Sequence, residues 1–327
     1  MELFTRVKIP ESDFRISYQS RLAFFGSCFA DNISAQFASR KFKVLANPFG
    51  TAYNPLSIER QLQHIADGKI FGEDDVFQDV RRDNGHGDNL WHCWDAHSSL
   101  SAATREECIA KLNNAAKQAR EFLQEADTVF ITLGSAYVYS LKEDDTGCGK
   151  IVANCHRQDP KIFERRLISV EEASQSIQRT AALLRKINRD THIVFTVSPI
   201  RHKGDGAHGN NLSKATVLLG IHNAGVPYFP SYEIVMDELR DYRFYESDMI
   251  HLSKNTEEYI FERMVATYCD DATQGNIAKV EKFLKTANHR IQDADSPATQ
   301  ELQEKLRMQA AELEKTIPGL SLNTKPI

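Results

Sequence analysis

Short apolar runs alternate with longer amphipathic stretches along most of this sequence. The clearest runs lie at 22–25, 127–133 and 192–197, and stretches with helical spacing of apolar residues separate them. Strands that are apolar throughout are typical of a parallel sheet covered by helices on both faces, because a solvent-facing side would require alternate polar residues. The pattern therefore predicts an α/β protein with three layers (α/β/α) and a central parallel sheet.

The remaining elements fit the same fold. Shorter strands are expected at 44–46 and 226–229. Helices are expected where apolar residues recur every three or four positions, at residues 31–40, 56–66, 105–124, 170–188, 210–223 and 255–268.

Residues 271–327 differ from the rest, since they are polar and charged. Helical spacing occurs there at 277–284 and 302–313. We therefore divide the chain into a domain at 1–270 and a helical C-terminal extension at 271–327. The extension is expected either to dock on the core or to form a homodimer through its helices, and a mobile tail is the alternative interpretation.

Charge and composition exclude several classes of protein. The 327 residues are 41% hydrophobic and 26% charged, and the net charge of −5 comes without a dense Lys/Arg patch, so we expect no nucleic-acid partner. The six cysteines are scattered without a CxxC pair, which indicates reduced thiols. Residues 1–6 do not resemble the start of a signal peptide, and no apolar run could span a bilayer. We therefore expect a cytoplasmic protein that has no membrane partner.

The stretch that carries chemistry is Gly26-Ser27-Cys28-Phe29-Ala30, between the first strand and the first helix. Glycine permits a tight turn, and a helix N-terminus supplies free N–H groups and positive potential that stabilise a thiolate or an oxyanion. Far along the chain, Asp248 precedes His251 by three residues. An Asp at this spacing can orient an imidazole as the general base for a nucleophile.

The Gly26-Ser27-Cys28-Phe29-Ala30 stretch resembles the signature of the GSCFA family, which belongs to the SGNH (GDSL-like) hydrolase group. Further blocks resemble the family in the same order, at residues 47–55, 91–98, 132–139, 154–156, 197–202 and 241–251. The resemblance covers roughly residues 1–270 and implies that this part is an SGNH-like domain. It implies the same three-layer fold and a catalytic loop around His251, but no particular substrate.

The resemblance also bears on the nucleophile. In the broad group this block opens Gly-Asp-Ser, so alignment on Gly26 puts Ser27 at the Asp position and Cys28 at the Ser position. Cys28 thus inherits the nucleophile position, and a thiol at a helix N-terminus beside a His is expected to be partly thiolate at neutral pH. Ser27 is the rival nucleophile. In the alternative without catalysis, Cys28 is a small buried filler and Ser27 caps the helix.

His251 is the candidate base and Asp248 its orienting partner, and the alternative is a solvated histidine on a surface loop. Backbone N–H groups of Cys28 and Gly50 are the candidate oxyanion donors. Where the group carries Gly-x-Asn-Asp, this chain has Leu133-Gly134-Ser135-Ala136, so the usual asparagine is missing. A side-chain donor would then come from Asn54, Ser135 or Asn154. Plain turn geometry is the alternative role for Gly50 and Gly134.

Several polar residues follow the expected strands. We expect His97, His156, Arg201 and His202 to line a substrate cleft at the carboxyl ends of the strands, where open α/β sheets bind ligands. A zinc site made of Cys155, His156, His97 and His202 is disfavoured by the irregular spacing, so no metal is expected. The basic loop 201–206 could contact a phosphate or a carboxylate. It lacks P-loop spacing, no GxGxxG follows the first strand, and no cofactor is expected.

These features predict an SGNH-type acyl-transfer enzyme. The expected reaction is removal of an ester-linked acyl group, for example acetyl on a carbohydrate, through a covalent acyl intermediate. Its partner would be a small-molecule or carbohydrate ester. Three alternatives stay open: an acyltransferase that uses a thioester donor, a binding module whose site has lost turnover, and a metal-dependent hydrolase.

Overall fold

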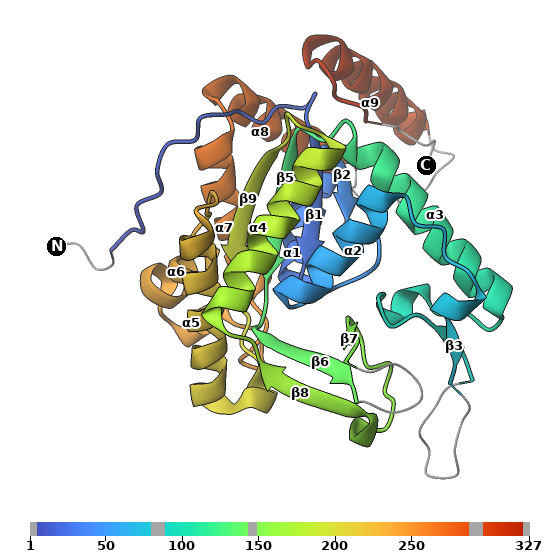
Figure 1. Cartoon of the computed structure of the whole chain (residues 1–327). Coiled ribbons are helices and arrows are strands. Elements are labelled where there is room, and N and C mark those ends of the chain that lie inside the picture. Colours follow the sequence, from blue (N-terminus) through green and yellow to red (C-terminus); the bar gives the residue numbers. More distant parts are fainter. Residues whose placement is uncertain (1–4, 80–88, 143–148, 288–296, 323–327) are drawn as a thin grey trace.

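A parallel sheet with strand order β2-β1-β5-β9 forms the centre of the protein. Figure 1 shows this computed structural model, which describes residues 5–79, 89–142, 149–287 and 297–322. The strands are β1 (Arg21–Gly26), β2 (Lys43–Ala46), β5 (Thr128–Leu133) and β9 (His192–Val197). The predicted strand at 226–229 makes only one parallel bridge, between Tyr228 and Phe195. Pro227 has no N–H to extend that ladder.

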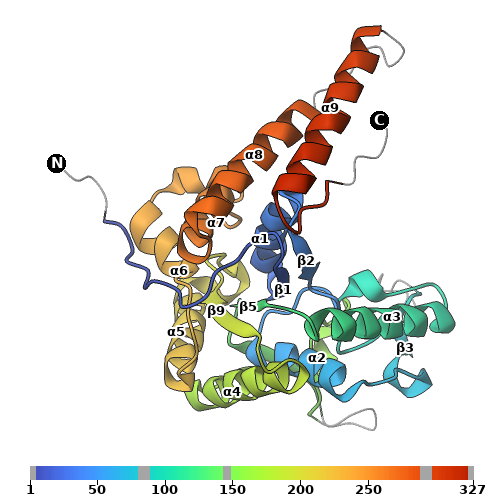
Figure 2. The same ribbon diagram turned by 90° about the horizontal axis from the view of Figure 1, so that it is seen from above.

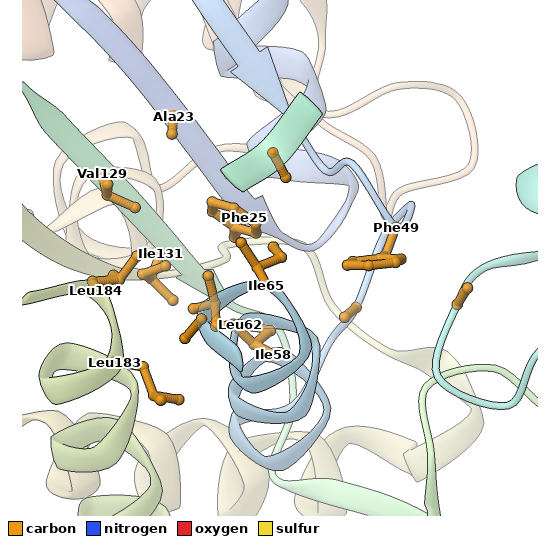
Figure 3. Packing of buried hydrophobic residues seen from close by; sticks show 14 of the residues in the cluster. Ala23, Phe25, Phe49, Ile58, Leu62, Ile65, Val129, Ile131, Leu183 and Leu184 are labelled. Atoms are coloured by element: carbon orange, nitrogen blue, oxygen red, sulfur yellow. The ribbon is translucent and has the colours of Figure 1, made fainter. Parts of the chain in front are cut away.

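Helices cover both faces of this sheet, so the predicted three-layer fold is confirmed (Figure 1). Leu22 and Phe24 of β1 pack in one cluster with α1 and α7, whereas Ala23 and Phe25 pack with residues of α2, α3, α4 and α5. Figure 3 shows part of the second cluster, in which Phe25 lies close to residues of α2. The helices are α1 (Cys28–Ser39), α2 (Pro55–Asp67), α3 (Arg105–Leu123), α4 (Val170–Ile187), α5 (Gly206–Ala224) and α7 (Lys254–Tyr268).

The strand order creates a crevice at the carboxyl ends of β1 and β5. From β1 the chain crosses to β2 on one side, and its next strand in the sheet, β5, lies on the other side. Gly26 pairs with Thr132 at the ends of these two strands. Such a switch point is where α/β sheets bind ligands, because the loops above it diverge.

Two small antiparallel sheets were not predicted from the sequence. β6 (Tyr137–Leu141) pairs with β7 (Ile151–Val152) and β8 (Phe163–Leu167), and β3 (Phe77–Gln78) pairs with β4 (Trp91–His92). β8 has the sequence FERRL with an exposed centre, so it lacks the apolar run by which the buried strands were recognised. β6 begins four positions after β5 ends and therefore stands at the crevice.

The C-terminal extension forms α8 (Asp271–Ala287) and α9 (Pro297–Thr316), which lie side by side and project from the sheet (Figure 2). Val280 and Phe283 of α8 are buried in the cluster that contains α1 and α7. Arg40, at the end of α1, pairs with Glu258 of α7 and Glu281 of α8. The extension is therefore docked on the core.

The short helix α6 (Ser231–Glu233) and the π-helical turn at Ile234–Leu239 connect the end of the sheet to the loop that precedes α7. Within the described ranges, no helix combines the length and the apolar content needed to cross a membrane.

Candidate active site

A cavity of about 550 Å³ opens at the carboxyl ends of β1, β5 and β9. Nine residues predicted as part of the site are among those that line it: Ser27, Cys28, Asn54, Gly134, Ser135, Asn154, Arg201, His202 and His251. Residues more than 200 positions apart in the sequence thus share one cavity. Gly50, His97, His156 and Asp248 are not among its lining residues.

The turn at Gly26 fixes the position of both candidate nucleophiles. Gly26 has a φ of +130°, and a Cβ at this position would overlap the carbonyl oxygen of Thr132 on β5. Only glycine fits so close to the neighbouring strand. Ser27 follows in extended conformation, and Cys28 is the first residue of α1, three positions before the predicted helix start.

Ser27 and Cys28 differ in their surroundings. Ser27 is 2% exposed, and within the described part of the chain its Oγ has no hydrogen-bond partner. It does not cap α1 through its side chain. Cys28 is half-buried and stands at the helix N-terminus, where its own N–H has no intrahelical acceptor.

The block at 47–55 braces this turn. Asn47 Oδ1 accepts the N–H of Gly26 at 2.8 Å, and Asn47 Nδ2 donates to Asp31 Oδ1 of α1 at 2.7 Å. The N–H of Ala52 donates to the carbonyl of Gly26 at 3.0 Å. These bonds hold the end of β1 and the start of α1 as one unit.

The same block also reaches β5. The carbonyl of Tyr53 accepts the N–H groups of Gly134 and Ser135 at 2.7 and 2.9 Å. Asn54 caps α2, because its Oδ1 accepts the N–H of Ser57 at 2.9 Å. The Asn54 amide hydrogens remain uncommitted among the described residues, and this residue lines the cavity.

The predicted oxyanion donors therefore separate into two groups. The N–H of Gly134 is taken by Tyr53, and the N–H of Gly50 donates to the carbonyl of Asn47 at 2.7 Å. Gly50 instead serves a turn with φ +76°, where a Cβ would overlap His97. Cys28 N–H and the side-chain amide of Asn54 remain as candidate donors, and both residues line the cavity. Ser135 Oγ accepts the N–H of Tyr137 at 2.9 Å.

Asp248 and His251 form the expected pair on an exposed loop. Asp248 Oδ2 lies 2.6 Å from His251 Nδ1, and their side chains are 44% and 54% exposed. The hydrogen bond from His251, together with the N–H groups of Ile250 and His251, lowers the pKa of Asp248 to about 2. A carboxylate on Nδ1 holds a proton there, so Nε2 is the nitrogen that can accept a proton from a nucleophile.

The predicted thiolate at Cys28 needs a correction. Burial raises the pKa of the Cys28 thiol above its ordinary value, and the carboxylate of Asp31 raises it further. The N–H groups of Phe29 and Cys28 and the ammonium of Lys214 lower this pKa, but they do not outweigh burial. At neutral pH the resting residue is therefore a thiol, and it needs a base.

Two predicted cleft residues point elsewhere. His156 is buried, with Nε2 2.9 Å from the carbonyl oxygen of Cys93 and Nδ1 3.0 Å from Ser98 Oγ. His97 Nδ1 accepts the N–H of Ser99 at 3.2 Å and caps a short helical turn. Both are held by loops of the 91–98 and 154–156 blocks. Across the described residues, no group of three His, Cys, Asp or Glu side chains is placed to hold a metal ion.

Residues 21–264 match the sequence model of the GSCFA family. This chain belongs to the GSCFA family. Among curated proteins, no sequence matches it. The match ends within α7, so the α8–α9 hairpin lies outside the family region.

Two solved structures resemble this GSCFA protein distantly. The periplasmic domain of a lipopolysaccharide acetyltransferase from Salmonella ser. Paratyphi A is 11% identical, with a TM-score of 0.34, and the match covers 76% of this chain and 84% of that one. An acetyl xylan esterase from the rumen bacterium Butyrivibrio proteoclasticus is 12% identical, with a TM-score of 0.34, over 77% of this chain and 64% of that one. Similarities this weak carry no argument about activity.

One residue of the GSCFA site escaped the sequence analysis. Lys214 of α5 is 2% exposed, and its Nζ donates to the carbonyls of Gly134 and Ser198 at 2.7 and 2.6 Å. Burial lowers the pKa of Lys214 to about 7. Its burial could have been predicted from its position in the helix, since Lys214, Val217 and Ile221 fall on one buried face of α5.

The second unforeseen contribution comes from β8. Arg165 lines the cavity, its guanidinium lies 3.8 Å from the ring centre of Tyr137, and it pairs with Asp205. This residue was missed because its strand was missed.

Proposed function

We propose that this GSCFA protein is an SGNH-type acyl-transfer enzyme that removes an ester-linked acyl group through a covalent intermediate. The observation that supports the proposal is the shared cavity of Cys28 and His251, with Asp248 bonded to the far nitrogen of the imidazole. Nucleophilic catalysis of this kind uses a nucleophile, a base that accepts its proton, and a third group that orients the base.

In the proposed reaction, His251 Nε2 takes the thiol proton as Cys28 sulfur attacks the acyl carbonyl. The oxyanion that forms is stabilised by the N–H of Cys28 and the side-chain amide of Asn54. The intermediate collapses to a thioester, and the imidazolium returns its proton to the departing alcohol. Water, deprotonated by His251, then attacks the thioester and regenerates the thiol while the carboxylic acid leaves.

Two variants of this function are compatible with the same cavity. If an acceptor hydroxyl replaces water in the second step, the protein is an acyltransferase, and a thioester donor suits a thiol nucleophile. If Ser27 attacks instead of Cys28, the protein is a serine esterase. The more exposed position of Cys28 at the helix N-terminus favours Cys28.

The test is turnover of a short-chain aryl ester and an aryl thioester by wild type and by Cys28→Ala, Ser27→Ala and His251→Ala. We expect loss of activity in Cys28→Ala and His251→Ala and retention in Ser27→Ala. His222→Ala is the matched control, because His222 is exposed on α5 and distant from the lining residues. Retained activity in Cys28→Ala would contradict the cysteine mechanism, and inactivity of the wild type on both substrates would favour a binding module.

A further inference from the structure

The wall of the cavity formed by β8 and the loop after β9 is cationic. Arg165, Arg201 and Lys203 line it, and no aspartate or glutamate is among the lining residues that the structure describes. The whole chain has a net charge of −5, so the positive wall is a local feature. A cleft lined by one sign of charge attracts ligands of the opposite sign.

Arg165 is held in a fixed orientation. Its guanidinium is stacked on Tyr137 and is paired with Asp205, whose side chain is almost fully buried. Asp205 also lies 3.2 Å from His202 Nδ1. This arrangement resembles a binding group that is positioned before the ligand arrives, which reduces the entropy lost on binding.

Arg201 and Lys203 have no carboxylate partner among the described residues. Within the described ranges, the one hydrogen-bond acceptor of the Arg201 side chain is Met236 Sδ at 3.6 Å, and Lys203 Nζ donates to the backbone carbonyl of Asp248 at 2.8 Å. Both residues are exposed at the cavity. Donors of this kind fit the oxygen atoms of a carboxylate or a phosphate.

We infer that the ligand of this cavity carries an anionic group, a carboxylate or a phosphate, which binds to Arg165, Arg201 and Lys203. The inference rests on the proposed function for its reaction, but the anion site is defined by these side chains alone. Since Lys203 also bonds to the loop of Asp248, an anion seated on this wall lies near the catalytic pair.

The experiment compares an aryl butyrate with the aryl hydrogen succinate, two esters that differ only in whether the acyl chain ends in a methyl group or in a carboxylate. We expect kcat/KM to favour the anionic ester in wild type, and Arg201→Gln to reduce that preference about tenfold, as loss of a charge-assisted hydrogen bond does. Arg189→Gln is the control, because Arg189 is exposed on a loop outside the cavity lining. Equal preference in wild type and Arg201→Gln would overturn the inference.

A binding measurement separates this inference from the proposed function. Benzoate and phenyl phosphate are titrated into wild type and Arg201→Gln by calorimetry, and the tighter of the two identifies the anion class. Binding that weakens in Arg201→Gln, without turnover of any ester, would support the anion site and contradict the proposed enzyme. Ester turnover with no binding of either anion would overturn the anion site and leave the enzyme standing.

Discussion

The turn at 26–28, which carries the proposed nucleophile, is largely buried and is held by distant parts of the chain, whereas the loop that carries His251 is exposed and is held mainly by its own residues. Thr132 of β5 bonds to the turn, and so do Asn47 and Ala52 from the block after β2. In the loop, Asp248 bonds to Ile250 and His251, and Lys203 supplies a contact from outside. The proposed nucleophile is thus positioned by the global fold, and the proposed base by a local turn.

This difference predicts that changes at the turn cost stability, whereas changes in the loop cost activity alone. The largest effect is expected for Gly26→Ala, because a Cβ would overlap Thr132 O in a conformation that disfavours side chains. We expect a loss of about 3 kcal/mol or more in the free energy of unfolding, measured by urea denaturation.

Gly275→Ala is the matched control for that change. Gly275 lies in α8 with open space around it, so alanine should raise stability by up to about 1 kcal/mol. Equal effects of the two substitutions would mean that the turn is not constrained by its neighbours.

The next largest effect on stability is expected from the buried ammonium group of Lys214. Because its folded pKa is lowered to about 7, the unfolded chain binds more protons between that pH and the ordinary lysine pKa of 10.5. Stability should therefore rise with pH through this window, and the penalty of burying the lysine is complete below about pH 7. Lys214→Met should remove this rise, and it should lower stability by about 2 kcal/mol at high pH through two unpaired carbonyls.

Urea denaturation at several pH values between 7 and 10 measures the Lys214 effect as a difference between wild type and variant. Other groups titrate in the same range, but they do so in both proteins. If the free energy of unfolding changed with pH in the same way in wild type and in Lys214→Met, folding would not lower the pKa of Lys214.

A smaller effect is expected at Asp31. Its carboxylate raises the pKa of Cys28, so Asp31→Asn should favour the thiolate and speed alkylation of Cys28 at pH 7 several-fold. The asparagine still offers an oxygen to Asn47. Peptide mapping after iodoacetamide treatment measures the rate, with the half-buried thiol of Cys155 as the internal standard. An unchanged or slower alkylation rate would mean that the Asp31 carboxylate does not raise the pKa of the Cys28 thiol.

The smallest effect on stability is expected for Asp248→Asn. The carboxylate is exposed, so the midpoint of urea denaturation at pH 7 should hardly move, while turnover should fall about 10²-fold as the imidazole loses its orienting partner. The control is Asp190→Asn, an exposed residue far from the cavity lining. Because the pKa of Asp248 is about 2, loss of its ionisation affects stability and activity only as the pH falls toward that value.

The sequence allowed the sheet and the main site to be predicted, because buried parallel strands are apolar throughout and their carboxyl ends converge. Of the residues predicted by this rule, Arg201 and His202 line the cavity, whereas His97 and His156 do not. The position of His251 near Cys28 was predicted from the resemblance to the family. β8 could not be foreseen, since FERRL resembles a polar loop until it pairs with β6. Arg165 was lost with it.

Electrostatic properties were harder to predict than positions. The helix N-terminus suggested a thiolate at Cys28, but the degree of burial is a tertiary property that no motif reveals. Asp31, by contrast, lies three positions after Cys28 on the same helix, so its opposing charge could have been read from the spacing. Lys214 and its two carbonyl partners belong to three separate elements that meet only in the folded chain.

The most direct test of the account is mass spectrometry of the protein quenched in acid during turnover of an aryl thioester. The account predicts an acyl group on Cys28 that forms more slowly in His251→Ala. An acyl group on Ser27, or turnover of the thioester with no acylated protein in a rapid-quench time course, would contradict it.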